Sequence, residues 1–342
     1  MAEPFFALGA DDQREVLEIA RERTGRPTHL LEKDVWVVWA LNALFSSALA
    51  SDLTFKGGTS LSKAYKIIDR FSEDIDLTYD IRKLIADLVD DDSALPGSRS
   101  QASKWSKAVR DRLPEWIDAQ VRPVLMEALA RDRLDVKLET GGTDHEKLLL
   151  HYPAHTLGTG YVSPVVTLEF GGRATGEPHQ VMQVSCDMDG HVDGVLFPVA
   201  SPQVMSVART FWEKATAAHV YCAQARIRGE RYARHWHDLA AIGRSSYFAA
   251  AITDREVAKA VAEHKSLFFI EKDADGAVID YFAATSGKLQ IVPDGTAREA
   301  LAADYDSMRA DDILVGNALA FDALMDACTP VAQAANAAAA GN

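Results

Sequence analysis

Cysteine is scarce in this sequence of 342 residues. Cys186, Cys222 and Cys328 are the only three, and none lies in a Cys-x-x-Cys pair or near histidines at zinc-ligand spacing. This pattern argues against a disulfide framework and against a structural zinc site. It favours a reduced, cytoplasmic protein.

Long apolar runs are also missing. The longest, residues 35–45 (VWVVWALNALF), is too short to cross a bilayer and is typical of a buried helix. The first residues, MAEPFFALGADDQ, have no basic stretch followed by an apolar segment, so they lack the pattern of a signal peptide. We therefore expect a cytoplasmic protein that does not bind membranes.

Basic residues are outnumbered by acidic ones. The chain has 36 Lys and Arg against 50 Asp and Glu, which gives a formal net charge of −14. Because nucleic-acid coat proteins gain affinity from a broadly basic surface, this balance argues against that class. It still allows an enzyme that holds a nucleic-acid end in a local basic groove.

The character of the sequence changes along its length, which exceeds that of an average domain. Short alternating runs indicate strands between residues 134 and 199, whereas helical periodicity dominates before and after them. We therefore predict a mixed α/β (α+β) core with N-terminal helices, residues 1–200, and a helical C-terminal domain, residues 201–330. The alanine-rich end, residues 331–342, is low in complexity and is expected to be frayed or disordered.

A glycine pair lies in the run KGGTSLSKAYKIIDRFSEDIDLTYD, residues 56–80. Gly57 and Gly58 end a short extended piece, and a helix is predicted to follow, with Thr59 and Ser60 as good N-caps. Glycines let a phosphate approach the backbone, and a helix start offers it N–H groups. Gly57, Gly58 and Ser60 are therefore candidate nucleotide-binding residues.

The predicted helix extends from residue 59 to residue 70. Lys63 and Arg70 lie two turns apart on one face of it and could add positive charge to a phosphate site. Taken alone, a glycine pair before a helix is more typical of an ordinary tight turn.

Two carboxylates follow on a predicted strand. Residues 74–79 alternate in character, which places Asp74 and Asp76 on the same face. Two such carboxylates repel each other unless a hard divalent cation lies between them, and Mg²⁺ held in this way can bridge a triphosphate and activate an attacking hydroxyl. A solvated strand face is the alternative. The glycine pair within twenty residues favours the metal site.

A third acid lies in the run SPVVTLEF, residues 163–170. Glu169 is a charge within an otherwise apolar strand, where burial is costly unless the charge is paired or bound to a metal. Metal ligation is favoured slightly over a salt bridge, for which Arg173 is a candidate partner. Asp135 and Glu139 are weaker candidates for the third acid.

In the helical half, Lys214 and Asp238 lie at the borders of apolar helix stripes. A lysine there either extends outward to solvent or reaches into a cleft. In a cleft it would contact a triphosphate and offset the charge that develops on leaving pyrophosphate. Sequence alone leaves both alternatives open.

Several stretches together resemble the AbiEii/AbiGii-type nucleotidyltransferase toxins, a family that includes the mycobacterial MenT-like toxins. The resemblance covers residues 30–245, with its motifs in order, and the glycine and DxD motifs are specific in combination. The motifs are LLEKDVWV at 30–37, GGTSLSK at 57–63, RFSEDIDL at 70–77, VTLEFGGR at 166–173, ARTFWEKATAAH at 208–219 and RYARHWHDL at 231–239.

The resemblance implies a nucleotidyltransferase-type mixed β-sheet with flanking helices and a helical C-terminal domain. It implies roles for the following residues: Gly57, Gly58 and Ser60 in the phosphate-side turn, Ser72, Asp74 and Asp76 in the metal-binding motif, and Lys214 and Asp238 as the essential residues of the helical motifs. Glu169 occupies the position of a third acid, a position at which members of the family differ.

One motif departs from the family pattern. The last motif often reads RD-x-x-DL, whereas this chain has RH-x-x-DL, with His235 in place of the first acid. Asp238 is kept, but a second acidic role at this motif is in doubt.

The resemblance implies transfer of nucleotides from NTP, in studied members onto the 3′ end of tRNA, and neutralisation by a partner antitoxin. We therefore predict a Mg²⁺-dependent nucleotidyltransferase toxin of a toxin–antitoxin or phage-defence system, with a two-metal site in which Mn²⁺ is an alternative ion. Two other functions stay open. Transfer of NMP to a protein side chain is weakly favoured by the acidic net charge, and an inactive fold could serve as a binding subunit. The intact set of Asp74, Asp76, Lys214 and Asp238 argues against inactivity.

Overall fold

The protein is described from a computed structural model. The structure describes residues 2–72, 74–89, 92, 94–156, 163–224, 232–310, 314 and 318–340. It divides into two compact units. The first unit comprises Met1–Tyr65, Phe71–Asp90 and Lys107–Val204, and the second comprises Lys66–Arg70, Asp91–Ser106 and Met205–Asn342. Two short segments from the first half of the sequence therefore belong to the second unit.

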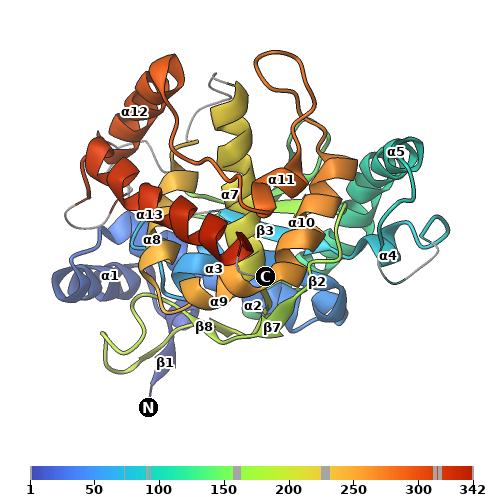
Figure 1. Ribbon diagram of the computed structural model, residues 1–342. Helices are drawn as coiled ribbons and strands as arrows, with labels where there is room; N and C mark the ends of the chain where they lie inside the picture. The colour runs from blue at the N-terminus through green and yellow to red at the C-terminus, as the bar shows by residue number, and fades with distance from the viewer. Residues whose placement is uncertain are drawn as a thin grey trace. The chain divides into compact units, whose positions relative to one another are not determined.

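A mixed β-sheet organises the first unit (Figure 1). In the described part of the chain it has seven strands, in the order β4-β5-β6-β3-β2-β11-β7. β3 is parallel to β6 and β2 is parallel to β11, whereas β2–β3, β4–β5 and β5–β6 are antiparallel pairs. The strands are β2 (Leu53–Lys56), β3 (Asp74–Tyr79), β4 (Lys137–Gly141), β5 (Lys147–His151), β6 (Val165–Gly171), β7 (His179–Val181) and β11 (Gln203–Met205).

Short elements complete this unit. β1 (Glu3–Pro4) pairs with β9 (Val195–Leu196), and β8 (Val184–Ser185) pairs with β10 (Val199–Ala200). The helices are α1 (Ala10–Thr24), α2 (Thr28–Phe45), α3 (Gly57–Lys63), α4 (Ile81–Leu84) and α6 (Arg122–Asp132), with 3₁₀ turns at Phe5–Ala7 and Ala48–Asp52.

The apolar helix α2 packs against β3 and β6. Every side chain of α2 from Leu30 to Leu41 is buried, which agrees with the run of apolar residues predicted to form a buried helix. No helix in the described part of the chain is long and apolar enough to cross a membrane.

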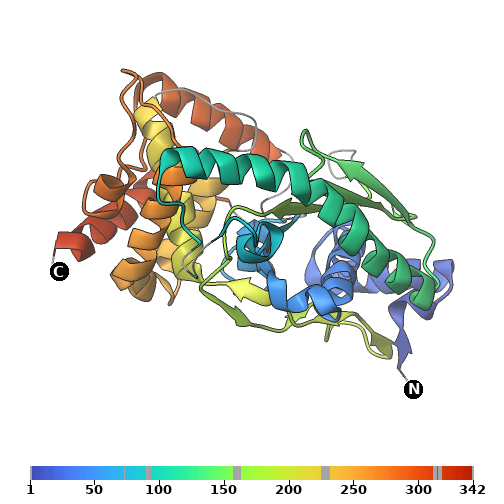
Figure 2. The same ribbon diagram turned by 90° about the vertical axis from the view of Figure 1, so that its right-hand side faces the viewer.

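A long helical rod lies against the same strands. It consists of α5 (Arg99–Trp116), a π-helical turn (Ile117–Val121) and α6 without a break between them (Figure 2). Trp116 stacks on Tyr79 of β3, with ring centroids 3.9 Å apart, and meets Phe170 of β6 edge-on at 5.7 Å. Because side chains alternate along a strand, the rod covers the face that Tyr79 and Phe170 share and leaves their neighbours for the opposite face.

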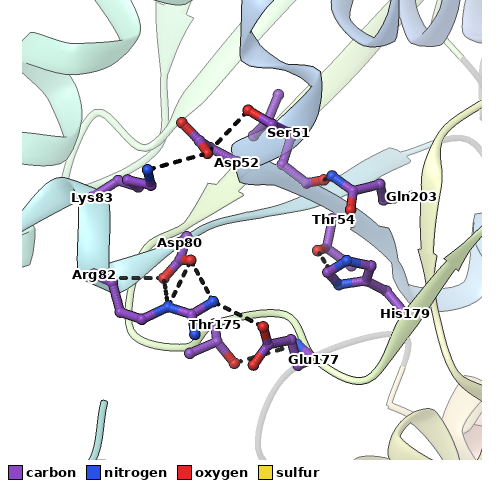
Figure 3. A network of polar contacts seen from close by, with 11 residues as sticks. Ser51, Asp52, Thr54, Asp80, Arg82, Lys83, Thr175, Glu177, His179 and Gln203 are labelled. Carbon is purple, nitrogen blue, oxygen red and sulfur yellow. Dashed lines mark hydrogen bonds and ion pairs between the residues drawn. The ribbon is translucent and has the colours of Figure 1, made fainter. Parts of the chain in front are cut away.

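A polar network supports the end of β3 that is remote from Asp74 (Figure 3). Asp80 accepts hydrogen bonds from the backbone and guanidinium of Arg82, which also contacts Glu177 at 2.9 Å. Gly176, with φ of +84°, lies so close to β2 that a Cβ atom would be 2.4 Å from the Thr54 hydroxyl. Arg82 pairs with both Asp80 and Glu177, so this network ties the segment after β6 to the sheet.

The second unit is helical. Besides the start of α5 it contains α7 (Val207–Gln224), α8 (Arg234–Arg244), α9 (Phe248–Thr253), α10 (Arg255–Phe268), α11 (Tyr281–Thr285), α12 (Gly295–Ala310) and α13 (Phe321–Ala340). Trp212 and Trp236 are buried in its core, and their indole N–H groups donate to the carbonyls of Ala251 and Ile291. The apolar stripes predicted for α7 and α8 thus pack inside this unit.

The alanine-rich end of the chain departs from its predicted disorder. α13 continues to Ala340, and Val331 and Ala335 are buried within it. A Cβ atom at Gly243 of α8 would lie 2.4 Å from the Val331 side chain, so the two helices pack closely. Alanine is the best helix former, and tertiary contact of this kind stabilises a helix that its composition alone would leave frayed. The prediction of disorder is therefore wrong for residues 331–340.

Candidate active site

The glycine pair lies directly against a carboxylate of the DxD motif. Gly57 follows β2 with φ of +80°, a conformation that side chains disfavour. A Cβ atom at Gly57 would lie 2.0 Å from Oδ2 of Asp76. The turn therefore requires glycine for two reasons, its backbone conformation and the space that the Asp76 carboxylate occupies.

Asp74 and Asp76 lie on the sheet face opposite the one that Ile75 and Leu77 share, as the alternation of β3 predicts. Both are half-buried, whereas Ile75 and Leu77 between and after them are fully buried. The carboxylates therefore lie on one face of one strand, where both can contact the same ligand.

A row of charges crosses four strands at Asp76. The register pairs Asp76 with Glu169 of β6 on one side and with Lys56 of β2 on the other, and Glu169 with Lys147 of β5. Residues in register on neighbouring strands share a face. We call Lys147, Glu169, Asp76 and Lys56 the charged row, because two adjacent acids lie between two lysines.

Glu169 forms an ion pair within this row. Its Oε2 lies 2.7 Å from Nζ of Lys147, whereas Arg173 was the salt-bridge partner considered from the sequence. Burial acts to lower the pKa of the Lys147 ammonium group. The hydrogen bond and charge of Glu169, followed by the charge of Asp74, outweigh burial, and the pKa is raised. Within the described residues, no three His, Cys, Asp or Glu side chains are grouped to hold a metal ion. Glu169 would thus have to exchange Lys147 for a metal to become a ligand.

Hydroxyl groups join the glycine turn to the start of β3. The Thr59 hydroxyl donates to the Asp74 carbonyl and lies 2.9 Å from Oγ of Ser72. The Ser60 hydroxyl donates to the carbonyl of Gly57 at 2.9 Å. Ser60 and Ser72, both candidate site residues, thus brace the turn and the strand that carry Gly57 and Asp74.

The sequence predicted that Lys63 and Arg70 share one face of a helix, but in the structure they do not. α3 ends at Lys63, and Lys66 has φ of +53°, which a right-handed helix cannot accommodate. Arg70 belongs to the second unit. The Lys63 ammonium is buried, contacts the Asp34 carboxylate and lies 2.6 Å from Oδ1 of Asp187. Its charge is therefore balanced inside the first unit.

Asp34 of α2 is the buried partner of Lys63. Its Oδ2 accepts a hydrogen bond from the backbone N–H of Asp187 at 2.6 Å, and Asp187 also pairs with Arg26 at 2.8 Å. Burial raises the pKa of Asp34 to about 6, although the charge of Lys63 acts to lower it. The network joins α2, the end of α3 and the segment after β8.

We expect Lys63→Met to destabilise the first unit by about 3–5 kcal/mol, because it leaves Asp34 as an uncompensated buried charge. Equilibrium unfolding in urea measures the loss. Lys63→Met with Asp34→Asn, which removes that charge, should recover most of the stability. The loss should also be smaller at pH 5 than at pH 8, since Asp34 with its raised pKa binds a proton more readily at pH 5. A cost below about 1 kcal/mol would show that the network is not structural.

In the second unit, a buried carboxylate holds two cations. Asp238 of α8 is fully buried and accepts hydrogen bonds from Arg70, Nε to Oδ1 at 2.7 Å and a terminal nitrogen to Oδ2 at 2.8 Å. Nζ of Lys214 lies 2.9 Å from the same Oδ2. Although burial opposes ionisation, the charges of Arg70 and Lys214 hold the pKa of Asp238 well below its ordinary value. Lys214 thus points inward and does not extend to solvent.

His235 lies one turn before Asp238 on α8. Burial, and then the charge of Lys214, lower its pKa well below the ordinary value, so the ring is neutral at pH 7. Its Nδ1 atom is enclosed and has no hydrogen-bond partner among the residues that the structure describes. A neutral imidazole cannot replace the acid that this position often carries in the family that the sequence resembles.

Several residues of these networks, among them Asp34, Arg70 and Lys147, were not assigned from the sequence in their observed role. Asp34 had a signal, because three charged residues in succession (Glu32–Asp34) interrupt an apolar helix and buried charges need partners. Arg70 and Lys147 had no such signal in the sequence, because their partners lie far away in the chain and on other elements.

Comparisons with known proteins show the family of the chain. The profile of the family described as "Nucleotidyl transferase AbiEii toxin, Type IV TA system" matches residues 39–327. The solved structure of the MenT4 nucleotidyltransferase toxin from Mycobacterium tuberculosis is 15% identical, covers 95% of this chain and 98% of its own, and has a TM-score of 0.42. JHP933 from Helicobacter pylori is 12% identical, with 91% and 94% coverage and a TM-score of 0.43. No curated protein sequence matches significantly. Because the family profile spans most of the chain, the protein belongs to the AbiEii nucleotidyl transferase toxin family and is a nucleotidyltransferase.

Proposed function

We propose that the protein is the toxin of a toxin–antitoxin system and transfers NMP from NTP to the 3′ end of tRNA, with release of pyrophosphate. Its family supports nucleotide transfer and the toxin role. The observation that carries the proposal is the close approach of Gly57 to Asp76. It brings the glycine turn against a carboxylate suited to a metal. The tRNA acceptor is proposed from the family resemblance of the sequence.

Asp74 and Asp76 fit a divalent cation. Both present carboxylate oxygens, the donors that Mg²⁺ prefers, from one face of β3. We therefore propose Mg²⁺ as the ion, with Mn²⁺ as an alternative, and Glu169 as a third ligand once it leaves Lys147. A bound ion would neutralise phosphate charge and make the attacking hydroxyl more acidic.

The other site residues bind and orient the substrate in this proposal. The turn at Gly57 and Gly58 holds the backbone at the start of α3 against the Asp76 carboxylate, where it would bind phosphate, and Ser60 and Ser72 keep that turn in place. Lys214 offsets the negative charge that develops on the leaving pyrophosphate. Asp238 touches neither substrate nor metal, because it is fully buried, and acts through the cations that it holds.

A cognate antitoxin is the proposed protein partner. The description of the family as toxins of type IV toxin–antitoxin systems supports such a partner.

Incubation of the protein with each α-labelled NTP and Mg²⁺, together with total tRNA or total protein, tests the proposal. We expect label in the tRNA fraction, lost in Asp76→Asn. Label confined to protein would instead support NMP transfer to side chains. Growth inhibition that is unchanged in Asp76→Asn, with no label in either fraction, would support an inactive binding subunit.

A further inference from the structure

Arg70, Asp238 and Lys214 form one cluster inside the second unit, although Arg70 comes from a five-residue segment early in the sequence. Asp238 is fully buried, and the side chains of Arg70 and Lys214 are 3% and 11% exposed. The charges of these three described side chains, two cations and one anion, sum to one positive charge.

The two cations do not hold Asp238 in the same way. Arg70 uses both carboxylate oxygens, one from Nε and one from a terminal nitrogen, whereas Lys214 contacts Oδ2, which it shares with Arg70. A planar guanidinium in this fork arrangement is fixed in orientation, whereas a lysine ammonium is a point charge on a flexible stem. Lys214 is therefore the cation that can move away from Asp238.

The departure of a cation has different consequences with and without Arg70. A buried carboxylate that loses its only cation is strongly destabilised, because its charge is no longer compensated. With Arg70 in place, Asp238 stays paired when Lys214 moves to another anion. Without Arg70, Lys214 would be the partner that keeps Asp238 compensated.

From this charge balance we propose that Arg70 is a positioning residue that keeps Lys214 available to an anionic phosphate group by supplying the counter-charge of Asp238. The inference rests on the proposed function, in which Lys214 contacts the pyrophosphate of the nucleotide. It adds Arg70 as a residue that acts through Asp238 and not by contact with substrate.

Three further described side chains near the cluster leave this balance intact. His235 is neutral, because burial and Lys214 lower its pKa. His237 Nδ1 lies 3.5 Å from Oδ1 of Asp238. This distance is longer than the 2.7 and 2.8 Å that separate the Asp238 oxygens from the Arg70 nitrogens. Lys265 acts electrostatically on His235 and donates to the Glu213 carbonyl at 3.2 Å.

The availability of Lys214 can be measured without any ligand. The rate at which acetic anhydride acetylates Lys214, followed by peptide mass spectrometry at pH 8, reports how much free amine it presents. We expect Arg70→Gln to lower this rate by about tenfold, because Lys214 would then compensate the buried charge of Asp238 and would stay paired with it. The exposed Arg309, which pairs with Asp306 at 3.8 Å, gives the matched control: Arg309→Gln should leave the rate unchanged.

A second pair of variants tests whether Arg70 acts on Lys214 through Asp238. Asp238→Asn removes the charge that Arg70 balances, so Asp238→Asn and Asp238→Asn with Arg70→Gln should acetylate at equal rates, both faster than wild type. An Arg70→Gln effect of the same size in both backgrounds would overturn the proposal, because Arg70 would then act without Asp238. If Arg70→Gln does not fold, the comparison of Asp238→Asn with the double variant Asp238→Asn, Arg70→Gln tests the proposal. Unequal acetylation rates in these two proteins would overturn the proposal.

Inorganic pyrophosphate then links the cluster to the proposed function. By calorimetric titration, Arg70→Gln should weaken pyrophosphate binding by about tenfold, and Arg70→Lys, which keeps the counter-charge, by less than about threefold. Equal weakening in Arg70→Lys and Lys214→Met would overturn the proposal. A wild-type protein that does not bind pyrophosphate, with acetylation rates in the expected order, would contradict the proposed function and leave the role of Arg70 in place.

Discussion

Asp76→Asn is expected to reduce nucleotide transfer on the order of 10³-fold, about 4 kcal/mol of transition-state stabilisation. The amide has the shape of the carboxylate but lacks the charge that a divalent cation requires. Because Asp76 is half-buried and lies between Glu169 and Lys56 in the charged row, loss of its charge should not unfold the sheet. The initial rate of label transfer and the thermal unfolding midpoint measure the two effects.

A graded control separates this effect from a general loss of acidic charge. Asp111→Asn removes an exposed carboxylate on α5 that pairs with Lys107, and it should leave transfer unchanged. Glu169→Gln should reduce transfer by about 10- to 100-fold, less than Asp76→Asn, since Glu169 is bound to Lys147 before any metal arrives. If Asp76→Asn keeps more than about one tenth of wild-type activity, the metal site is placed wrongly.

Gly57→Ala is expected to reduce transfer by about 10²-fold, because its Cβ atom would force the Asp76 carboxylate out of position. The new methyl group would lie 2.0 Å from Oδ2, and the φ of +80° adds strain that an alanine bears and a glycine does not. The expected stability cost is about 2–4 kcal/mol, the sum of backbone strain and displaced side chain. Transfer rate and urea unfolding measure the two effects.

Gly194 provides the matched control for Gly57. Its φ of +79° is nearly the same, but no atom lies within 4 Å of a Cβ built there. Gly194→Ala should therefore cost only backbone strain, about 1–2 kcal/mol, and leave transfer unchanged. Equal activity losses in the two variants would mean that the contact between Gly57 and Asp76 has no part in catalysis.

Much of the first unit follows from local sequence patterns. The alternation of residues 74–79 and 163–170 predicts two strands whose acids share a face, and both strands are present with Asp76 beside Glu169. The apolar run 35–45 lies in α2. These features are predictable because side-chain period alone decides which face a residue occupies.

Partners at long range in the sequence were not predictable. Lys63 and Arg70 are seven residues apart, and helical periodicity placed them on one face of one helix. A positive φ at Lys66 ends that possibility, and the two side chains pair with Asp34 and Asp238 instead. Such a break depends on tertiary contacts that override local helix propensity. For the same reason, the alanine-rich end is helical where its composition indicated disorder.

Binding of Mn²⁺ in the presence of a non-hydrolysable NTP analogue, followed by electron paramagnetic resonance, decides most directly whether the glycine turn and Asp76 form a metal–nucleotide centre. Wild-type protein should bind Mn²⁺ in a way that depends on the nucleotide, and Asp76→Asn should weaken this binding by at least about tenfold while Asp111→Asn does not. Equal Mn²⁺ binding in wild type and Asp76→Asn would contradict the assignment of the active site.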